Sequence, residues 1–173
     1  NDACSSATAL AIGGAGQVTS YGDTTGAKDD VALTSAGCTG KVTAGPDVFY
    51  AFKATAGNTY SVILSGAAGY NRALYVFGSC AAPQATCVGG SDQASIEKVV
   101  FTPSSAGTYL VGVDGRGATD AGKFTLTIKE QAAQTNDRCA TAKPLSLGSG
   151  SASDSGDTKL ATNTLSLPAT GCT

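Results

Sequence analysis

The opening of this chain occurs twice, and the repeat constrains the fold more than any other feature of the sequence. The second copy starts at Asn136, at an offset of 135 residues, and the offset becomes 134 from Gly22 onward. A repeat at this period predicts one complete unit followed by the opening of a second unit. The clearest matches are Asn1–Cys4 with Asn136–Cys139, Gly22–Thr24 with Gly156–Thr158, and Gly37–Thr39 with Gly171–Thr173.

We therefore expect a complete module over residues 1–130, a short polar linker over 131–135 and an incomplete second module over 136–173. The first stretch has the usual size of a domain with one hydrophobic core, whereas the last is too short to form a core. The apolar side chains of residues 136–173 would pack on a continuation of the same chain or on another subunit, unless this segment is disordered. They are Leu145, Leu147, Leu160, Leu165 and Leu167.

The composition indicates a secreted or cell-surface protein and excludes several partners. Charged residues make up 14% of the chain, against a usual ~25%, and the net charge is −2. Since no basic cluster is present, neither nucleic acid nor an anionic membrane surface is an expected partner. No apolar run approaches the ~18 residues of a membrane span. The absence of Met indicates either a removed signal peptide or an excerpt of a longer chain.

Six cysteines predict disulfides and an oxidising compartment. Because two of them recur in the repeat, each repeated pair most simply closes within its own copy, which leaves the other two to bond across a six-residue loop. Zinc is disfavoured because the chain has no His and no C-x-x-C spacing. The predicted bonds are Cys4–Cys38, Cys80–Cys87 and Cys139–Cys172.

Short runs with a period of two, separated by Gly, Pro and Asn, are typical of β-strands. Residues 59–65, for example, alternate Tyr, Val and Leu with Ser and Ile. Because no segment shows a 3.6-residue period, we predict an all-β fold, an antiparallel β-sandwich of the jelly-roll type. The expected strands lie within 7–12, 17–21, 47–52, 59–65, 73–77, 96–102, 108–113 and 123–129.

The order of these runs also carries a family resemblance. The sequence has N-D-x-C-x-x-A-x-x-L at its start, G-P-D-V-F-Y-A-F at 45–52, A-L-Y-V-F-G-S-C at 73–80 and A-G-T-Y-L-V-G-V-D-G-R-G at 106–117. It resembles the bacterial pre-peptidase C-terminal domain and its cysteine-bearing relatives, which occur as tandem modules in large secreted proteins. The resemblance implies a non-catalytic jelly roll with a role in secretion, adhesion or matrix binding, and sometimes with bound calcium. Relatives often have a carboxylate-rich stretch just after the second cysteine of this small loop. In this chain the stretch after Cys87, residues 88–92, has one carboxylate, that of Asp92.

We do not expect the protein to be an enzyme. The chain has no His, so the commonest general base is missing. It also lacks a G-x-S-x-G elbow, a P-loop and a G-x-G-x-x-G motif, and its cysteines are assigned to disulfides.

Four aspartates are the candidate metal ligands. Asp23, Asp29 and Asp30 fall in one polar loop, and Asp47 opens the next strand. Ca²⁺ takes several carboxylate and carbonyl oxygens, and a Gly-rich loop offers both. The alternative is a solvated loop in which Asp29 and Asp30 bond to their own backbone. The second copy keeps Asp23 as Asp157, but it replaces Asp29 and Asp30 by Asn163 and Thr164.

Two functions stay open. The first is a structural unit of a head-to-tail extracellular fibre or repeat array, whose partners are neighbouring copies of the same module. The second is an adhesive module that binds an extracellular glycan or protein. Tyr21, Tyr70 and Tyr75 could line a glycan groove, although core packing is the commoner role of tyrosine. Asp114 could be a ligand, although a turn residue is the simpler interpretation.

Overall fold

The computed structural model describes residues 1–93, 95–133, 136, 140, 142–156 and 158. The chain divides into two units, Asn1–Gln131 and Ala132–Thr173. Among the described residues, no helix has the length and apolar character that crossing a membrane requires.

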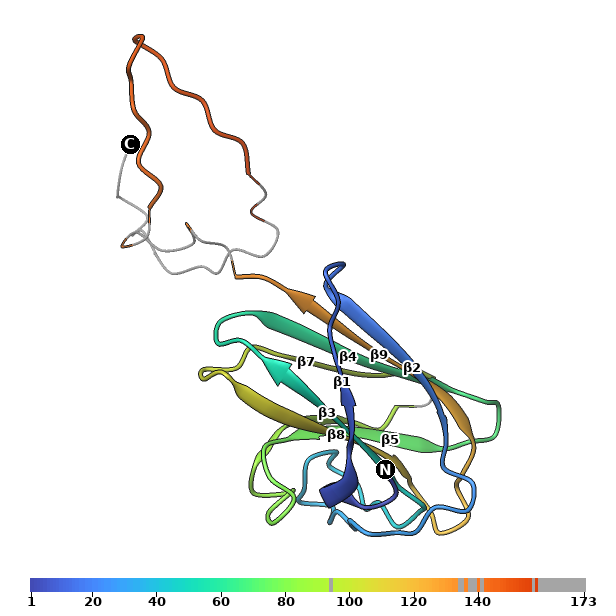
Figure 1. Cartoon of the computed structure of the whole chain (residues 1–173). Helices are drawn as coiled ribbons and strands as arrows, with labels where there is room; N and C mark the ends of the chain where they lie inside the picture. The colour runs from blue at the N-terminus through green and yellow to red at the C-terminus, as the bar shows by residue number, and fades with distance from the viewer. Residues whose placement is uncertain (94, 134–135, 137–139, 141, 157, 159–173) are drawn as a thin grey trace, which may run out of the picture. The chain divides into compact units, whose positions relative to one another are not determined.

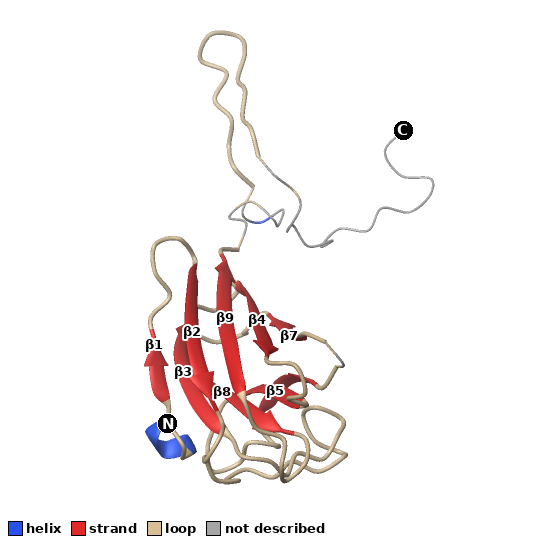
Figure 2. Cartoon of the chain, turned by 90° about the vertical axis from the view of Figure 1, so that its right-hand side faces the viewer, coloured by secondary structure: helices blue, strands red, loops and turns tan. Residues whose placement is uncertain are grey.

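The first unit is a β-sandwich of two sheets, which confirms the predicted fold class (Figures 1 and 2). All neighbouring strands are antiparallel except β1 and β3, which run parallel. The five-stranded sheet has the order β1 (Thr8–Leu10), β3 (Val48–Ala54), β8 (Gly107–Gly115), β5 (Arg72–Phe77) and β6 (Cys87–Ser91). The four-stranded sheet has the order β2 (Gln17–Asp23), β9 (Lys123–Gln131), β4 (Thr59–Gly66) and β7 (Glu97–Phe101).

The strand pattern of the sequence matches the observed core. Tyr60, Val62 and Leu64 of β4 are fully buried between the sheets, whereas the residues between them are only partly buried. Strand β6 was not predicted, because Gly89 and Gly90 interrupt any alternation of apolar side chains there. A side chain at Gly90 would collide with the backbone of Cys38, so this strand requires glycine.

The outer face of the five-stranded sheet is covered by the segment between β2 and β3. All six residues of β5 are buried, because Tyr75 and Phe77 on its outer side pack with Phe49 and with Leu33 of the covering segment. The long loops gather at one end of the unit, away from the end of β9 (Figure 2). We call residues 24–46 the covering loop. The sandwich therefore has one covered outer face, and the outer face of its other sheet is the candidate for binding.

The disulfides connect Cys4 with Cys80 and Cys38 with Cys87, so the predicted pairs Cys4–Cys38 and Cys80–Cys87 are wrong. The Cα atoms of the observed pairs are 5.8 and 5.6 Å apart. The repeat placed Cys4 and Cys38 in one segment, but the two ends of that segment reach different strands. Cys4 lies in a 3-10 turn, η1 (Cys4–Ser6), and bonds to the loop after β5, whereas Cys38 bonds to β6.

Hydrogen bonds, and not a disulfide, close the six-residue loop. The Thr86 hydroxyl donates to Ala82 O at 2.7 Å and accepts from the N–H groups of Gly78 and Ser79. Both observed disulfides instead attach the opening segment to the body of the unit. Cys139 and Cys172 lie outside the described residues.

In the second unit, the described residues 142–156 form no strand. Lys143 and Asp154 make an ion pair at 2.8 Å, and Leu145 and Leu147 are 54% and 68% exposed. Leu160, Leu165 and Leu167 lie outside the described residues.

Candidate binding site

Five polar or aromatic side chains lie together on the outer face of the four-stranded sheet. In β2 the alternation directs Tyr21 and Asp23 outward, and Lys123 and Thr125 of β9 and Ser65 of β4 take the same face. Tyr21 and Ser65 both pair with Thr125, and Asp23 pairs with Lys123. The register therefore brings residues that are far apart in the sequence into one patch.

These side chains line an open hollow of about 600 Å³, which we call the tyrosine hollow. Beneath it, Phe124 faces the core and is flanked in register by Gly22 and Gly66. A side chain at Gly22 would collide with the Phe124 ring and the Tyr50 hydroxyl. Gly22 lets the ring lie against bare backbone, whereas a side chain at Gly66 would meet Arg72 and Tyr70.

The tyrosine hollow combines an aromatic face with charges of both signs. The side chain of Tyr21 is 80% exposed. Asp23 Oδ1 accepts the Thr25 N–H at 2.9 Å, and hydrogen bonds from Thr25, helped by the nearby Lys123 charge, hold the pKa of Asp23 below its usual value. Asp23 is therefore an ionised hydrogen-bond acceptor at neutral pH. It lies in the same hollow as the Lys123 ammonium group and the hydroxyl groups of Ser65 and Thr125. Such a set suits a ligand that has hydroxyl groups and an apolar ring face.

The structure separates the four predicted metal ligands. Asp23 belongs to the tyrosine hollow, whereas Asp47 is fully buried below the covering loop, on which Asp29 and Asp30 are exposed. Asp47 Oδ2 accepts the N–H groups of Asp30 and Val31 at 3.2 and 2.8 Å, and its buried Oδ1 has no hydrogen-bond partner in the described part of the chain. The part of the chain that the structure describes contains no cluster of three or more His, Cys, Asp or Glu side chains placed to hold a metal.

Asp114 is a buried residue of β8, which the sequence analysis did not predict. The sequence suggested a turn, but β8 continues to Gly115, and Asp114 follows the Val48–Val113 pair directly opposite Asp47. Asp114 is fully buried, and Tyr75 donates its hydroxyl proton to Oδ2 at 3.2 Å. Burial, with the nearby Asp47 charge, raises the pKa of Asp114 to about 8, and burial raises the pKa of Asp47 to about 7. The alternation of residues along β8, continued past Val113, is the sequence signal that could have predicted Asp114 within the strand.

Only one of the three predicted groove tyrosines can meet a ligand through its ring. Tyr75 is fully buried below the covering loop, and Tyr70 is buried with its hydroxyl donating to Asp114 O at 3.1 Å. Tyr21, by contrast, is exposed on the outer face of the four-stranded sheet. Tyr21 and Tyr70 each line a hollow, whereas the buried Tyr75 is removed from the predicted set.

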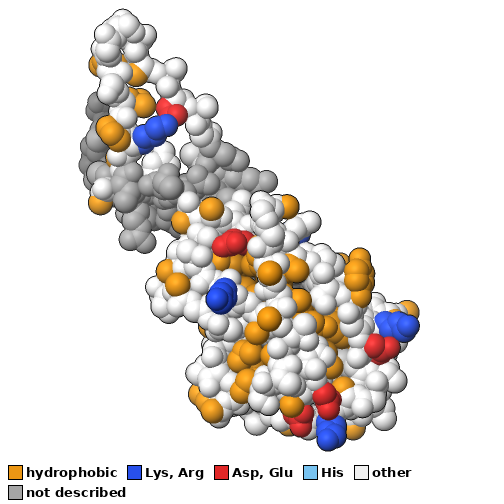
Figure 3. Space-filling model, viewed as in Figure 1, with side chains coloured by type: hydrophobic (Ala, Val, Ile, Leu, Met, Phe, Trp, Pro, Cys, Tyr) orange, Lys and Arg blue, Asp and Glu red, His pale blue; other side chains and the backbone are white. Residues whose placement is uncertain are grey.

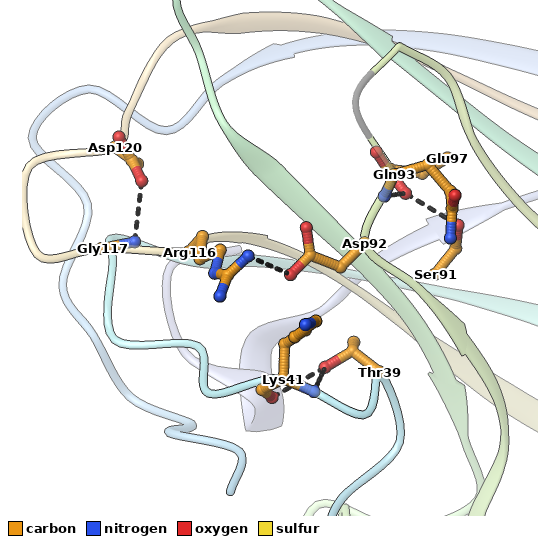
Figure 4. A network of polar contacts seen from close by, with 9 residues as sticks. All are labelled: Thr39, Lys41, Ser91, Asp92, Gln93, Glu97, Arg116, Gly117 and Asp120. Carbon is orange, nitrogen blue, oxygen red and sulfur yellow. Dashed lines mark hydrogen bonds and ion pairs between the residues drawn. The ribbon is translucent and has the colours of Figure 1, made fainter. Parts of the chain in front are cut away.

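A set of polar contacts connects the loops that follow β6 and β8 (Figure 4). Glu97 Oε2 accepts the Ser91 hydroxyl at 2.7 Å and the Gln93 N–H at 2.6 Å. Arg116 lies 3.5 Å from the buried carboxylate of Asp92. Charged side chains are otherwise scattered over the face in Figure 3, without a continuous basic patch.

A family model described as galactose binding domain-like, and associated with type IX secretion, matches residues 1–115. No curated protein matches the chain.

Solved structures show similar folds at low identity. A periplasmic inhibitor of g-type lysozyme from Aeromonas hydrophila, PliG, is 21% identical with a TM-score of 0.50, over 72% of this chain and 96% of that one. The pre-peptidase C-terminal domain of collagenase from Bacillus anthracis is 11% identical with a TM-score of 0.47, over 71% and 94%. PliG from Salmonella Typhimurium is 14% identical with a TM-score of 0.40, over 72% and 99%. The first of these likenesses supports the sandwich fold.

Proposed function

The chain belongs to the galactose binding domain-like family, and from this premise we propose that it is a non-catalytic carbohydrate-binding module of a secreted protein. Its two disulfides fit an oxidising, extracellular location. The observation that carries the proposal is the tyrosine hollow, where an aromatic ring stands beside fixed polar groups. Binding sites for small ligands combine apolar surface with a few convergent polar groups in this way.

The geometry suggests how a sugar would bind. One apolar face of the ring would lie on Tyr21, which offers a large contact area with few rotatable bonds. Its hydroxyl groups would donate to the Asp23 carboxylate and accept from Lys123. Hydrogen bonds to charged groups contribute about 1.5–3 kcal/mol each, more than neutral ones. The site would therefore recognise a neutral sugar through both stacking and charge-assisted hydrogen bonds.

Replacing Tyr21 tests this function. We expect Tyr21→Ala to weaken binding of galactose and galactose-containing glycans at least about tenfold in calorimetry, because the ring supplies the stacking surface. The exposed position of Tyr21 should leave the melting temperature unchanged. Thr19→Ala, on the same outward face of β2, is the control. Equal binding by Tyr21→Ala and the parent chain, or binding of no carbohydrate at all, would refute the proposal.

We propose separately that Asp47, together with Asp29 and Asp30 on the covering loop, takes a calcium ion. The support is the buried Asp47 Oδ1, which has no hydrogen-bond partner among the described residues, and the charges of Asp29 and Asp30 near Asp47. A cation would offset the buried charge, and Ca²⁺ accepts carboxylate and backbone oxygens. Ca²⁺ should then raise the melting temperature, and Asp47→Asn should remove that shift while Asp23→Asn keeps it. A melting temperature that neither Ca²⁺ nor EDTA changes would exclude the ion.

The module could also join neighbouring copies head to tail, and we propose this as a second role. The support is the repeat itself. Leu10 and Ile12 pack on the core, whereas their counterparts Leu145 and Leu147 are exposed. Disulfides bond the opening segment to its own unit, so this segment cannot be replaced by the matching segment of another copy. Residues 136–173 of one copy would therefore have to bind to the neighbouring copy as an additional segment. Strand β1 pairs only with β3, and an apolar groove of about 560 Å³ that includes Leu10, Ile12 and Phe52 lies beside it.

Light scattering tests the connecting role. The full chain should self-associate, and a chain truncated after Glu130 should not. Leu145→Asp and Leu147→Asp should weaken association, with Ser149→Asp as the control in the same segment. Equal association of the truncated and full chains would remove the tail as the connector.

A further inference from the structure

A second hollow adjoins the tyrosine hollow. Its volume is about 460 Å³, and both hollows are lined by Gly66 and Ala67. The turn between β4 and β5 borders it on one side, and Gln93 and Ser95 border it on the other. We call it the amide hollow, because Asn71 and Gln93 project there. The two hollows therefore adjoin at the end of β4, where they share Gly66 and Ala67.

The amide hollow contains polar side chains whose backbone is held in place and whose amide groups are available to a ligand. The side chains of Asn71 and Gln93 are exposed and make no hydrogen bond within the described part of the chain. Their backbones are fixed, since Asn71 O accepts the Arg116 N–H at 3.0 Å and the Gln93 N–H donates to Glu97 (Figure 4). Each amide can donate and accept at once, as adjacent sugar hydroxyl groups require.

Arg72 is an independent sign that the amide hollow takes a polar ligand. Its side chain lines the hollow and is only 7% exposed. The guanidinium donates to Tyr70 O at 3.1 Å and to Ser95 O, yet the buried Nε has no hydrogen-bond partner among the described residues. A buried donor without an acceptor is unfavourable, and a ligand oxygen or a bridging water would supply the acceptor.

We infer that the ligand is an oligosaccharide or a stretch of polysaccharide, with one ring on Tyr21 and an adjoining sugar unit in the amide hollow at Asn71 and Gln93. This inference rests on the carbohydrate function proposed for the tyrosine hollow. Each hollow alone lies within the size of a small-ligand site, ~300–1,000 Å³, so the pair exceeds the needs of a single ring. Tyr70 also lines the amide hollow, but it is only 5% exposed, so the second unit depends mainly on hydrogen bonds.

The test compares ligand lengths on the full chain. Calorimetry with galactose and with galacto-oligosaccharides of two, three and four units should show affinity rising about tenfold or more from the monosaccharide to the longer ligands. The double variant Asn71→Ala with Gln93→Ala should lower oligosaccharide affinity to the monosaccharide level and leave galactose binding unchanged. Gln17→Ala, an exposed glutamine elsewhere on β2, is the matched control.

The outcomes separate the two proposals. Equal affinity for all lengths, or a double variant that binds oligosaccharides as the parent does, overturns the amide hollow and leaves the tyrosine hollow standing. A double variant that weakens galactose as much as the oligosaccharides also overturns it, because the amides would then act at the first ring. Absence of binding to every ligand overturns both proposals.

Discussion

Two opposed, buried carboxyl groups should make the protein less stable as the pH rises above 5. Asp47 and Asp114 have pKa values of about 7 and about 8 in the fold, against 3.8 for an ordinary Asp. The folded state therefore keeps protons that the unfolded state has released. This stabilisation is complete below pH 3.8 and is lost as the pH rises through 7 and 8. Asp29 and Asp30 on the covering loop add to the repulsion at Asp47.

The size of the effect follows from the number of retained protons. Each retained proton changes the free energy of unfolding by about 1.4 kcal/mol per pH unit, so two give about 2.7. Between pH 5 and 7 the loss should be about 3–5 kcal/mol, which is large against the ~5–15 kcal/mol of a typical domain. Since the two groups interact, their protons leave in two steps that belong to the pair.

Urea unfolding followed by circular dichroism, in EDTA from pH 5 to 8, measures this dependence. Asp114→Asn should roughly halve the slope and exceed the parent in stability at pH 8, because the neutral amide ends the repulsion. Asp23→Asn is the control, since the lowered pKa of Asp23 affects stability only as the pH falls toward 3.8 and below. A parent chain of constant stability from pH 5 to 8, or an unchanged slope in Asp114→Asn, would refute the reasoning.

Three further predictions concern the fold. A non-reducing peptide map should show Cys4 joined to Cys80 and Cys38 joined to Cys87. A peptide that joins Cys4 to Cys38 would contradict the structure. The same map tests the predicted Cys139–Cys172 bond. Removing Cys4 and Cys80 together by serine should lower the free energy of unfolding by about 4 kcal/mol, because the bond closes a loop with a sequence separation of 76. Gly112→Ala should destabilise by about 1–3 kcal/mol in urea unfolding, because its methyl group would collide with the buried Tyr75 ring, while Gly107→Ala meets open space and should not.

The local pattern of the sequence determined the strands and the fold class. Tyr60, Val62 and Leu64 alternate with Ser61, Ile63 and Ser65, and a strand places the two sets on opposite faces whatever it pairs with. The scarcity of charge and the number of cysteines likewise indicated a disulfide-bonded protein before any contact was known. These properties depend on neighbours along the chain, so they could be predicted from the sequence alone.

Only the tertiary structure decided which residues meet. Tyr21 and Tyr75 both stand in strands, yet Tyr75 is buried because the covering loop closes over its face, whereas the face of Tyr21 stays open. Cys4 meets Cys80, and Asp47 meets Asp114, because strand register and loop path bring distant segments together. Alternation along a strand specifies the face that a side chain takes, but the packing of segments far apart in the chain determines what lies against that face.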